Sequence, residues 1–251
     1  MPEGPSIVIL KEKIRYLKHK TVLEASGYAD LDMAMFEGRK IMDFKSWGKH
    51  FLICFSDFSI RIHFGLFGSY QFHEPKKVNP KIALHFNDDA VYFYVCTVKR
   101  IDQPLDEVYD FEADVMAKEW KPAKALRKLK ALGEQKICDV LLDQNIFSGV
   151  GNIIKNEVLY RCKVHPESVV AEIPETRLKE VIKECRTYSF DFLKWKQNNE
   201  LSRHFQVYEQ KTLRNSPKIV TRKDTGKTKR SSYFVEGDQK LYNQSLKNTT
   251  R

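Results

Sequence analysis

The chain has 251 residues, of which 42% are hydrophobic, so it can bury one large core or two ordinary ones. Lysine and arginine total 43 against 33 acidic residues, and the formal charge of +10 favours an acidic partner such as nucleic acid, although a solvated basic surface would account for it too. No secretory segment opens the chain and no long apolar run occurs, so neither export nor membrane insertion is expected.

The cysteines are odd in number and far apart, and no two of them form a Cys-x-x-Cys pair. This spacing predicts neither a zinc ribbon nor a disulfide framework. We expect reduced, mostly buried thiols in a cytosolic protein. The five residues are Cys54, Cys96, Cys138, Cys162 and Cys185.

The first half of the chain is predicted to be one helix followed by short strands. Apolar residues at helical spacing favour a helix over residues 5–18, with Pro5 in its first turn. Aromatic and β-branched segments separated by polar turns then predict a β-sandwich or barrel up to about residue 100. The clearest strands span residues 50–55, 60–64, 83–86 and 91–95, the last two joined as a hairpin.

After about residue 112 the pattern becomes helical. A long helix with an apolar stripe begins near Pro174, and a basic, polar tail starts at about residue 206. That tail predicts a small hairpin from strands at 218–221 and 231–235 around the turn at 224–227. The shorter helices are expected at residues 114–120, 123–132, 137–143 and 153–162.

The opening Met1-Pro2-Glu3 carries a possible reaction. Removal of Met1 would leave a secondary amine on Pro2, which can attack an aldehyde carbon and form a cationic iminium. An N-terminal amine has a pKa near ~8, against ~10.4 for lysine, so much of it is uncharged at neutral pH. Glu3 could then transfer protons. Many chains begin with Met-Pro without functional consequence, so the other motifs decide how this start is interpreted.

The segment Gly149-Val150-Gly151-Asn152 precedes a predicted helix. Glycines allow a tight turn and close backbone approach, and Asn152 stands where a helix N-cap is expected. Exposed N–H groups at a helix N-terminus form a phosphate site. By itself the segment fits an ordinary C-cap glycine followed by an Asn cap equally well.

Together, Pro2-Glu3-Gly4-Pro5, the β-rich first half, and Gly149-Val150-Gly151-Asn152 with the later His165-Pro166 resemble the formamidopyrimidine-DNA glycosylase/endonuclease VIII family. This resemblance implies an α+β fold with an N-terminal β-sandwich, a helix-two-turn-helix domain and a C-terminal β-hairpin finger. The expected boundaries are 1–111, 112–205 and 206–243, with a disordered tail over 244–251. It implies a monomeric base-excision repair enzyme that binds damaged DNA, duplex or single-stranded, without a cofactor.

The resemblance assigns roles to individual residues. Pro2 matches the nucleophile that attacks C1′ of the damaged nucleotide and forms a Schiff base, and Glu3 matches its acid–base partner. Lys49 matches a hairpin lysine that contacts phosphate and supports both reaction steps. His63 matches a position near the DNA backbone, and Asn152 matches a phosphate-binding residue. Without the resemblance, Lys49 would be a solvated turn lysine and His63 a half-buried histidine.

The predicted finger departs from the usual family pattern. Relatives commonly hold one Zn²⁺ there with two Cys-x-x-Cys pairs, but this chain has no cysteine after Cys185, so thiolate ligation is impossible and no metal is expected. The usual cysteine positions of the second strand fall on Val235 and Asp238. The segment is similar to a zincless finger, in which Arg230 matches the catalytic arginine that contacts phosphates beside the flipped nucleotide.

Two further positions are less regular. Ser6 stands where the family commonly has a glutamate, which leaves the substrate range and rate open. Leu66, with Phe67 beside it, matches the side chain that fills the gap left by a flipped base, although a core leucine is equally consistent with the pattern. Further gap-filling residues are expected from a loop near Lys99 and Arg100.

The resemblance predicts removal of oxidised bases, pyrimidines favoured, followed by β,δ-elimination at the abasic site. The alternative is a non-catalytic DNA-binding protein that keeps the fold, and a generic RNA-binding protein is the weaker third reading because no stacking motif of RNA modules occurs. The expected location is the cytoplasm or nucleoid, or the nucleus in a eukaryote.

Overall fold

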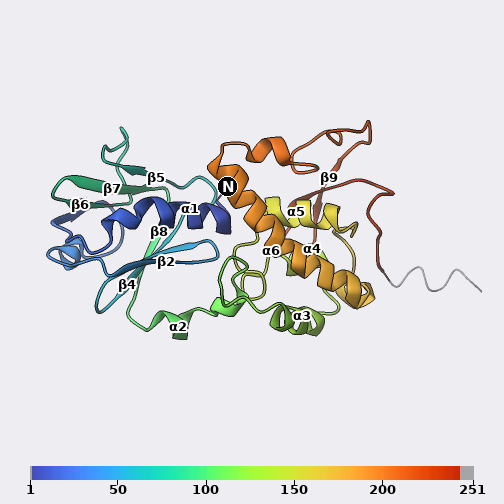
Figure 1. Ribbon diagram of the computed structural model, residues 1–251, viewed down its shortest axis with the longest axis horizontal. Helices are drawn as coiled ribbons and strands as arrows, with labels where there is room; N and C mark the ends of the chain where they lie inside the picture. Colours follow the sequence, from blue (N-terminus) through green and yellow to red (C-terminus); the bar gives the residue numbers. More distant parts are fainter. Residues whose placement is uncertain (1, 244–251) are drawn as a thin grey trace, which may run out of the picture. The chain divides into compact units, whose positions relative to one another are not determined.

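Helix α1 (Gly4–Ile14) opens the chain, as predicted, in a computed structural model that describes residues 2–243 (Figure 1). Pro5 occupies the first turn, where its missing N–H costs nothing, and Ile7, Leu10 and Ile14 face the core at helical spacing. A 3₁₀ turn, Arg15–Leu17, ends the helix. The predicted disordered tail over 244–251 lies outside the described residues.

Eight strands follow in two antiparallel sheets, and the predicted β-sandwich is confirmed. One sheet has the order β1-β6-β7-β5 and the other β2-β3-β4-β8. Apolar side chains of both sheets and of α1 form a single core, to which strands β3, β6 and β7 contribute the most buried residues. The strands are β1 (Glu24–Ser26), β2 (Asp43–Trp47), β3 (His50–Cys54), β4 (Ser59–His63), β5 (Ser69–Phe72), β6 (Ile82–Phe86), β7 (Asp89–Tyr94) and β8 (Thr97–Ile101).

The chain separates into two compact units, Met1–Asp110 and Phe111–Arg251. The short helix α2 (Leu105–Val108) closes the first unit. The second contains a helical core in which α5 packs against α6 and α3 against α6. Its helices are α3 (Pro122–Ala131), α4 (Ile137–Val140), α5 (Asn152–Arg161) and α6 (Glu175–Gln197), with 3₁₀ turns at Phe111–Ala113, Val170–Glu172 and Leu201–His204. No helix within residues 2–243 is both long and apolar enough to cross a membrane.

The predicted helix over 114–120 is wrong. Asp114 pairs with Ser148 in an isolated bridge, and its carboxylate accepts from the Met116 amide at 2.8 Å, which stabilises a turn instead. Arg186 of α6 donates to the carbonyls of Val115 and Ala117, both at 2.8 Å. These carbonyls therefore accept hydrogen bonds from the side chain of a distant helix and not from the amides of a local helix.

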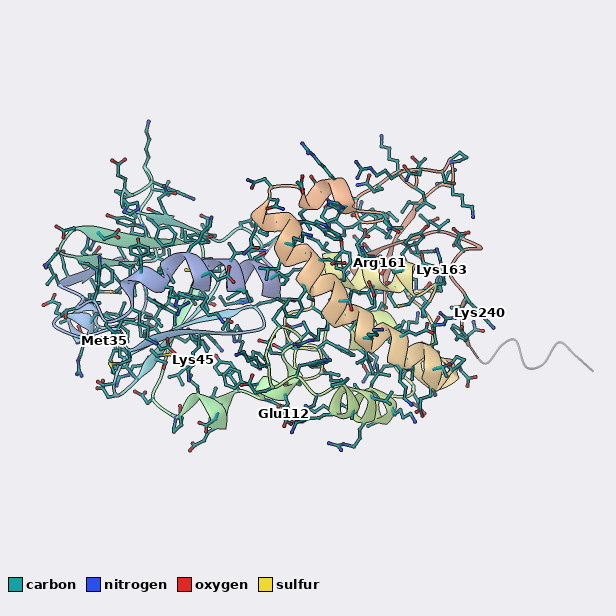
Figure 2. All side chains as sticks on the ribbon, viewed as in Figure 1. Met35, Lys45, Glu112, Arg161, Lys163 and Lys240 are labelled. Atoms are coloured by element: carbon teal, nitrogen blue, oxygen red, sulfur yellow. The ribbon has the colours of Figure 1, made fainter. Side chains whose placement is uncertain are left out.

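Arg161, at the end of α5, ties that helix to α6. Its guanidinium, at the residue labelled in Figure 2, donates to Glu184 at 2.8 Å and to Asp191 at 3.4 Å. It also lies over the ring of Tyr188. A planar cation can pair with carboxylates at its edge and an aromatic ring on its face at once. The contact orients α5, which carries the Gly-x-Gly-Asn segment at its other end.

The tail forms the predicted hairpin, shifted slightly along the chain. Strands β9 (Thr221–Thr225) and β10 (Arg230–Phe234) pair antiparallel, and β10 packs on α5. The ring of Phe234 meets His165 edge-on at 4.4 Å, and Val235 is buried with Val207 in a small apolar cluster. The hairpin belongs to the second unit and has little core of its own.

Candidate active site and nucleic-acid interface

The start of α1 holds the predicted nucleophile and its partner. Pro2 is partly exposed, whereas Glu3 is completely buried. The Glu3 carbonyl accepts from the amides of Ser6 at 2.8 Å and Ile7 at 3.4 Å, so the first helical turn fixes the backbone of Glu3. A fully buried carboxylate beside a partly exposed imino group is a pairing found at functional sites, so Glu3 is a functional candidate in this unit.

Lys49 lies on the tight turn between β2 and β3, as predicted. Gly48 has φ +52°, a conformation that favours glycine, and the strands close with Trp47 opposite His50. The Nδ1–H of His63, on β4, donates to the Lys49 carbonyl at 3.1 Å. His63 thereby holds the turn that carries Lys49, a structural role that coexists with the predicted contact near DNA.

An aromatic cluster lies beneath this turn. The ring of His50 lies 5.2 Å from that of His63, 5.5 Å from that of Trp47 and 5.7 Å from that of Tyr109. Burial, with the positive charges of Arg61, His63 and Lys49, lowers the pKa of His50 from 6.5 to about 3. His50 is therefore neutral at physiological pH and adds no charge beside Lys49.

Leu66 and Phe67 project from the turn between β4 and β5. Their exposed fractions are 49% and 77%, which rules out the core-leucine interpretation. Gly65, at φ +57°, favours the left-handed backbone, and a Cβ on Gly68 would meet the Phe64 carbonyl at 2.4 Å. The glycines thus force a tight turn that presents two large apolar side chains to solvent, as expected for a side chain that enters a base stack.

Lys99 and Arg100 do not lie in a loop themselves. Both residues lie within strand β8, where Arg100 faces Ile60 across the sheet and not the Leu66 turn. The Arg100 guanidinium covers the ring of Phe58 at 4.8 Å and donates to Asp102 at 2.5 Å. Their backbone pairs with that of β4, and a gap-filling contribution from a loop near them stays a prediction.

In the second unit, the Gly149–Asn152 segment forms a sharp turn into α5. Gly149 has φ +96° and donates its amide to Gln144 Oε1 at 3.1 Å, while Gln144 Nε2 donates to the Val150 carbonyl at 3.1 Å. Gln144 therefore holds the turn from both sides, a role that sequence reasoning missed. The N-cap is Gly151 rather than Asn152, which is the first residue of the helix.

The Asn152 side chain reaches the finger instead of capping the helix. Its Nδ2 donates to the carbonyl of Ser231 at 3.0 Å. Arg230, the preceding residue, is exposed at the start of β10. The structure therefore brings Asn152 and the segment of Arg230 together within one unit, although 78 positions separate them in the sequence (230 minus 152).

Asp139 holds the tip of the hairpin, a second residue that sequence reasoning missed. Its carboxylate accepts from the Lys227 amide at 2.9 Å, the Thr228 amide at 3.3 Å and the Thr228 hydroxyl at 3.1 Å. A Cβ on Gly226 would meet the carboxylate at 2.3 Å, so the turn requires glycine there. The side chain of α4 thereby fixes the end of a hairpin with little apolar core.

The family models provide the decisive comparison. The Formamidopyrimidine-DNA glycosylase N-terminal domain matches residues 1–100, and the Formamidopyrimidine-DNA glycosylase H2TH domain matches residues 111–188. The chain belongs to the formamidopyrimidine-DNA glycosylase/endonuclease VIII family.

Individual relatives agree with this membership. Endonuclease 8-like 3 of Xenopus laevis is 26% identical over 91% of this chain and 39% of its own length. Endonuclease 8-like 2 of Bos taurus is 35% identical over 60% of this chain and 48% of its own length. The chain thus spans less than half of these curated glycosylase-family relatives.

Solved structures show the same fold. Lactococcus lactis formamidopyrimidine DNA glycosylase, bound non-covalently to DNA with an AP site, superposes with a TM-score of 0.84 at 17% identity and covers 95% of this chain and 99% of its own. A viral DNA glycosylase reaches a TM-score of 0.82 at 20% identity, over 95% of this chain and 100% of its own. At such identities the likeness concerns the fold alone.

The finger of this family member does not fit a zinc ion. Within residues 2–243, no three His, Cys, Asp or Glu side chains are arranged to hold a metal. Val235 is buried in an apolar cluster, and Asp238 pairs with Lys218 at 2.5 Å. Cys138, which borders the hairpin through Thr225, has its pKa raised by burial and thus remains a thiol. Protein side chains must therefore hold this finger together, as a zinc ion does in relatives with two Cys-x-x-Cys pairs.

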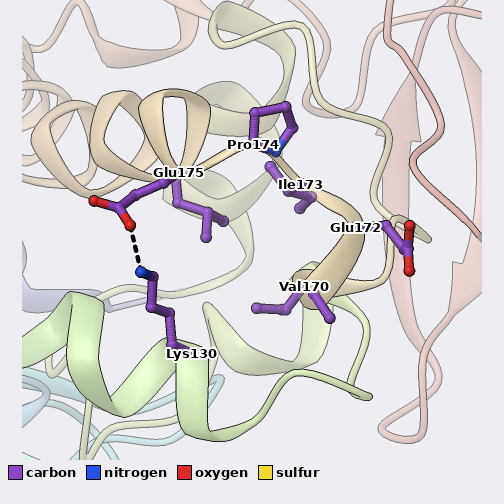
Figure 3. Close-up of a pocket in the computed structure, with 8 residues that line it drawn as sticks. Lys130, Val170, Glu172, Ile173, Pro174 and Glu175 are labelled. Carbon is purple, nitrogen blue, oxygen red and sulfur yellow. Dashed lines mark hydrogen bonds and ion pairs between the residues drawn. The ribbon is translucent and has the colours of Figure 1, made fainter.

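A hollow of about 450 Å³ lies elsewhere in the second unit, between α3 and the start of α6 (Figure 3). Lys130 and Glu175 form an ion pair across it, and Lys179 lies 2.7 Å from the same carboxylate. These pairings lower the pKa of Glu175 to about 2. The charged residues of the lining are Lys130, Glu172 and Glu175, so the hollow lacks the excess positive charge expected of a phosphate site.

Proposed function

We propose that this chain is a bifunctional DNA glycosylase and AP lyase of base excision repair. The observation that carries the proposal is the pairing of a partly exposed Pro2 with a completely buried Glu3 at the start of α1. An imino nucleophile next to a carboxylate shielded from water suits covalent catalysis assisted by proton transfer.

In the proposed reaction, the Pro2 nitrogen, freed by removal of Met1, attacks C1′ of the damaged nucleotide. The bond between N and C1′ forms, the glycosidic bond breaks, and the base leaves with a proton. Ring opening gives an iminium, which acidifies the C2′ proton so that the 3′ phosphate leaves, followed by the 5′ phosphate in the δ step. Glu3 supplies and accepts protons, and Lys49 stabilises phosphate from its turn.

Residues from each of the two units are proposed to contact DNA. In the first unit, Leu66 on its exposed turn is the proposed gap-filling residue. In the second, Asn152 and Arg230 are the proposed phosphate contacts, and the formal charge of +10 supplies the long-range attraction. Binding should therefore weaken steeply as salt concentration rises.

Oxidised pyrimidines are the proposed preferred substrates, because Pro2-Glu3-Gly4-Pro5 resembles the start of the endonuclease VIII branch of the family. Ser6 offers no carboxylate at the position where the family commonly has one, so the lesion range must be measured directly. Oligonucleotides with thymine glycol, dihydrouracil, hydantoin, formamidopyrimidine or 8-oxoguanine, in duplex and single-stranded form, would rank the lesions.

Borohydride trapping on DNA with an abasic site tests the chemistry. The wild-type protein should form a covalent adduct, Pro2→Ala should not, and Glu3→Gln should lower base excision by about 10²–10⁴-fold. Pro75→Ala, at an exposed proline, is the matched control and should trap like wild type. Trapping by Pro2→Ala at the wild-type level would refute the proposed nucleophile.

Mass spectrometry of the same preparation shows whether Met1 has been removed. A protein that retains Met1 has its Pro2 nitrogen in an amide, and it should bind DNA without forming the adduct. That result would favour the alternative, a non-catalytic DNA-binding protein with the glycosylase fold.

A further inference from the structure

Lys155 on α5 is buried without any exposed surface, and it is among the largest fully buried side chains of the described chain. Its ammonium donates to the hydroxyl of Ser232 at 3.0 Å and to the carbonyl of Ser231 at 3.3 Å, both on β10. An ammonium removed from water costs several kcal/mol unless its hydrogen bonds are replaced. A lysine that only filled space here would be replaced at lower cost by methionine or leucine.

The Ser231 carbonyl is the meeting point of three donors. Besides Lys155, it accepts from Asn152 Nδ2 at 3.0 Å and from Asn156 Nδ2 at 3.3 Å. The three donors stand at i, i+3 and i+4 and therefore share one face of α5. Asn156 also accepts from the Tyr233 amide at 2.9 Å, so the same face holds two points of the strand.

The contact extends through β10 to β9. The hydroxyls of Ser232 and Thr225 are 2.6 Å apart, and both residues are buried. Lys155 is thus connected to both strands through side chains alone. This polar network occupies the interior of a hairpin that cannot bind a metal through thiolates.

We propose that Lys155 is a positioning residue that sets the direction of Arg230 by clamping the Ser231 carbonyl and the Ser232 hydroxyl to α5. This role rests on the proposed function, in which Arg230 contacts DNA phosphate. Arg230 directly precedes the clamped carbonyl, and Asn152 belongs to both the clamp and the proposed phosphate turn. Lys155 therefore couples the two phosphate contacts of the second unit, and a displacement of about 1 Å at such a contact can cost on the order of 10²-fold in rate.

A double-mutant cycle tests the role through binding, without requiring catalysis. The probe is a duplex with a tetrahydrofuran abasic analogue, and the full chain is used as wild type, Lys155→Met, Arg230→Ala and the double variant. Lys155→Met should weaken binding about tenfold or more in the wild-type background and not at all once Arg230 is alanine. Lys194→Met, at an exposed lysine of α6, removes the same charge and should change binding less than twofold in either background.

Hydrogen exchange gives a second readout. Lys155→Met should speed amide exchange over 230–234 at least tenfold while α6 stays protected. If Lys155→Met does not fold, Ser232→Ala, which removes one acceptor of Lys155 and the hydroxyl partner of Thr225, takes its place in the cycle with the same expected pattern. Equal losses in both backgrounds would overturn the positioning role and leave the function standing. Absence of any preference of the wild-type protein for the abasic duplex would overturn the function and, with it, the role.

Discussion

Glu157, on α5, offers the sharpest test of how the finger is attached. Its buried carboxylate accepts from the backbone amides of Val207 at 2.9 Å and Tyr208 at 2.8 Å, and from that of Gln206 at 3.0 Å to each oxygen. These three amides begin the segment that leads to the hairpin. Removing that side chain therefore breaks the hydrogen bonds that these three adjacent N–H groups donate to it.

Replacing Glu157 with leucine should destabilise the second unit strongly. A buried N–H group left unpaired, such as that of Val207, costs about 1–3 kcal/mol, whereas the amides of the partly buried Tyr208 and the exposed Gln206 cost less, so the expected total is about 2–4 kcal/mol. At roughly 2–4 °C per kcal/mol for a chain of this size, the melting transition should fall by about 4–16 °C. Differential scanning calorimetry at pH 7 measures it.

Two further variants separate the effect of losing the hydrogen-bond acceptor at Glu157 from the effect of losing a negative charge. Burial raises the pKa of Glu157 above 4.5 despite the amide donors, so a neutral acceptor is well tolerated, and Glu157→Gln should cost about 1 kcal/mol or less. Because the folded-state pKa is raised, wild type should gain stability relative to Glu157→Gln as pH falls towards 4.5. Glu180→Leu, which breaks an exposed pair with Arg177, should change stability by less than about 1 kcal/mol. A leucine variant of Glu157 as stable as wild type would refute the reasoning.

Two pH dependences follow from the same structure. His50 has a folded-state pKa of about 3 against 6.5 when unfolded, so its contribution is present at neutral pH and lost as pH falls from 6.5 towards 3. The free energy of unfolding, measured with urea, should fall by about 2–4 kcal/mol less between pH 6.5 and 4 in His50→Phe than in wild type. An unchanged pH dependence of the unfolding free energy would contradict this expectation. Hydrogen bonds from Lys136 and Lys223 lower the pKa of Glu167 to about 2, so its contribution is present above 4.5 and lost as pH falls towards 2. Because the lysines are partly exposed, Glu167→Gln should lower the free energy of unfolding by only about 1 kcal/mol at pH 7 and leave it unchanged near pH 2. A loss of stability that persists in acid would argue against the ion pairs.

Local patterns were sufficient for most of the fold. The alternation of Ile60–Phe64 and the hairpin around 87–89 predicted the sandwich, because side chains on opposite faces of a strand report burial directly. Apolar spacing likewise predicted α3, α5 and α6. The helix predicted over 114–120 failed because Ser148 and Arg186, both distant in sequence, take its backbone groups. The strand that contains Lys99 and Arg100 was missed because cross-strand pairing is not visible in a short segment.

The features of the candidate site also divide into those that the sequence predicted and those that only the fold shows. The pairing of Pro2 with Glu3 could be recognised from the residue order, since the chemistry lies in adjacent side chains. The burial of Glu3 and the exposure of Leu66 could not be, because both depend on what packs around them. Gln144 and Asp139 left no signal in the sequence, as their partners are backbone groups whose position only the fold defines.

The amino-acid order alone established that the tail cannot bind zinc through thiolates, because no cysteine follows Cys185. How the finger is held without metal was decided by tertiary structure: Lys155 meets Ser232 across 77 positions, and Asp139 meets Lys227 across 88. Such pairs share no local pattern. Their hydrogen bonds form only after packing has brought α4 and α5 against the hairpin, and burial then makes each of those bonds costly to lose.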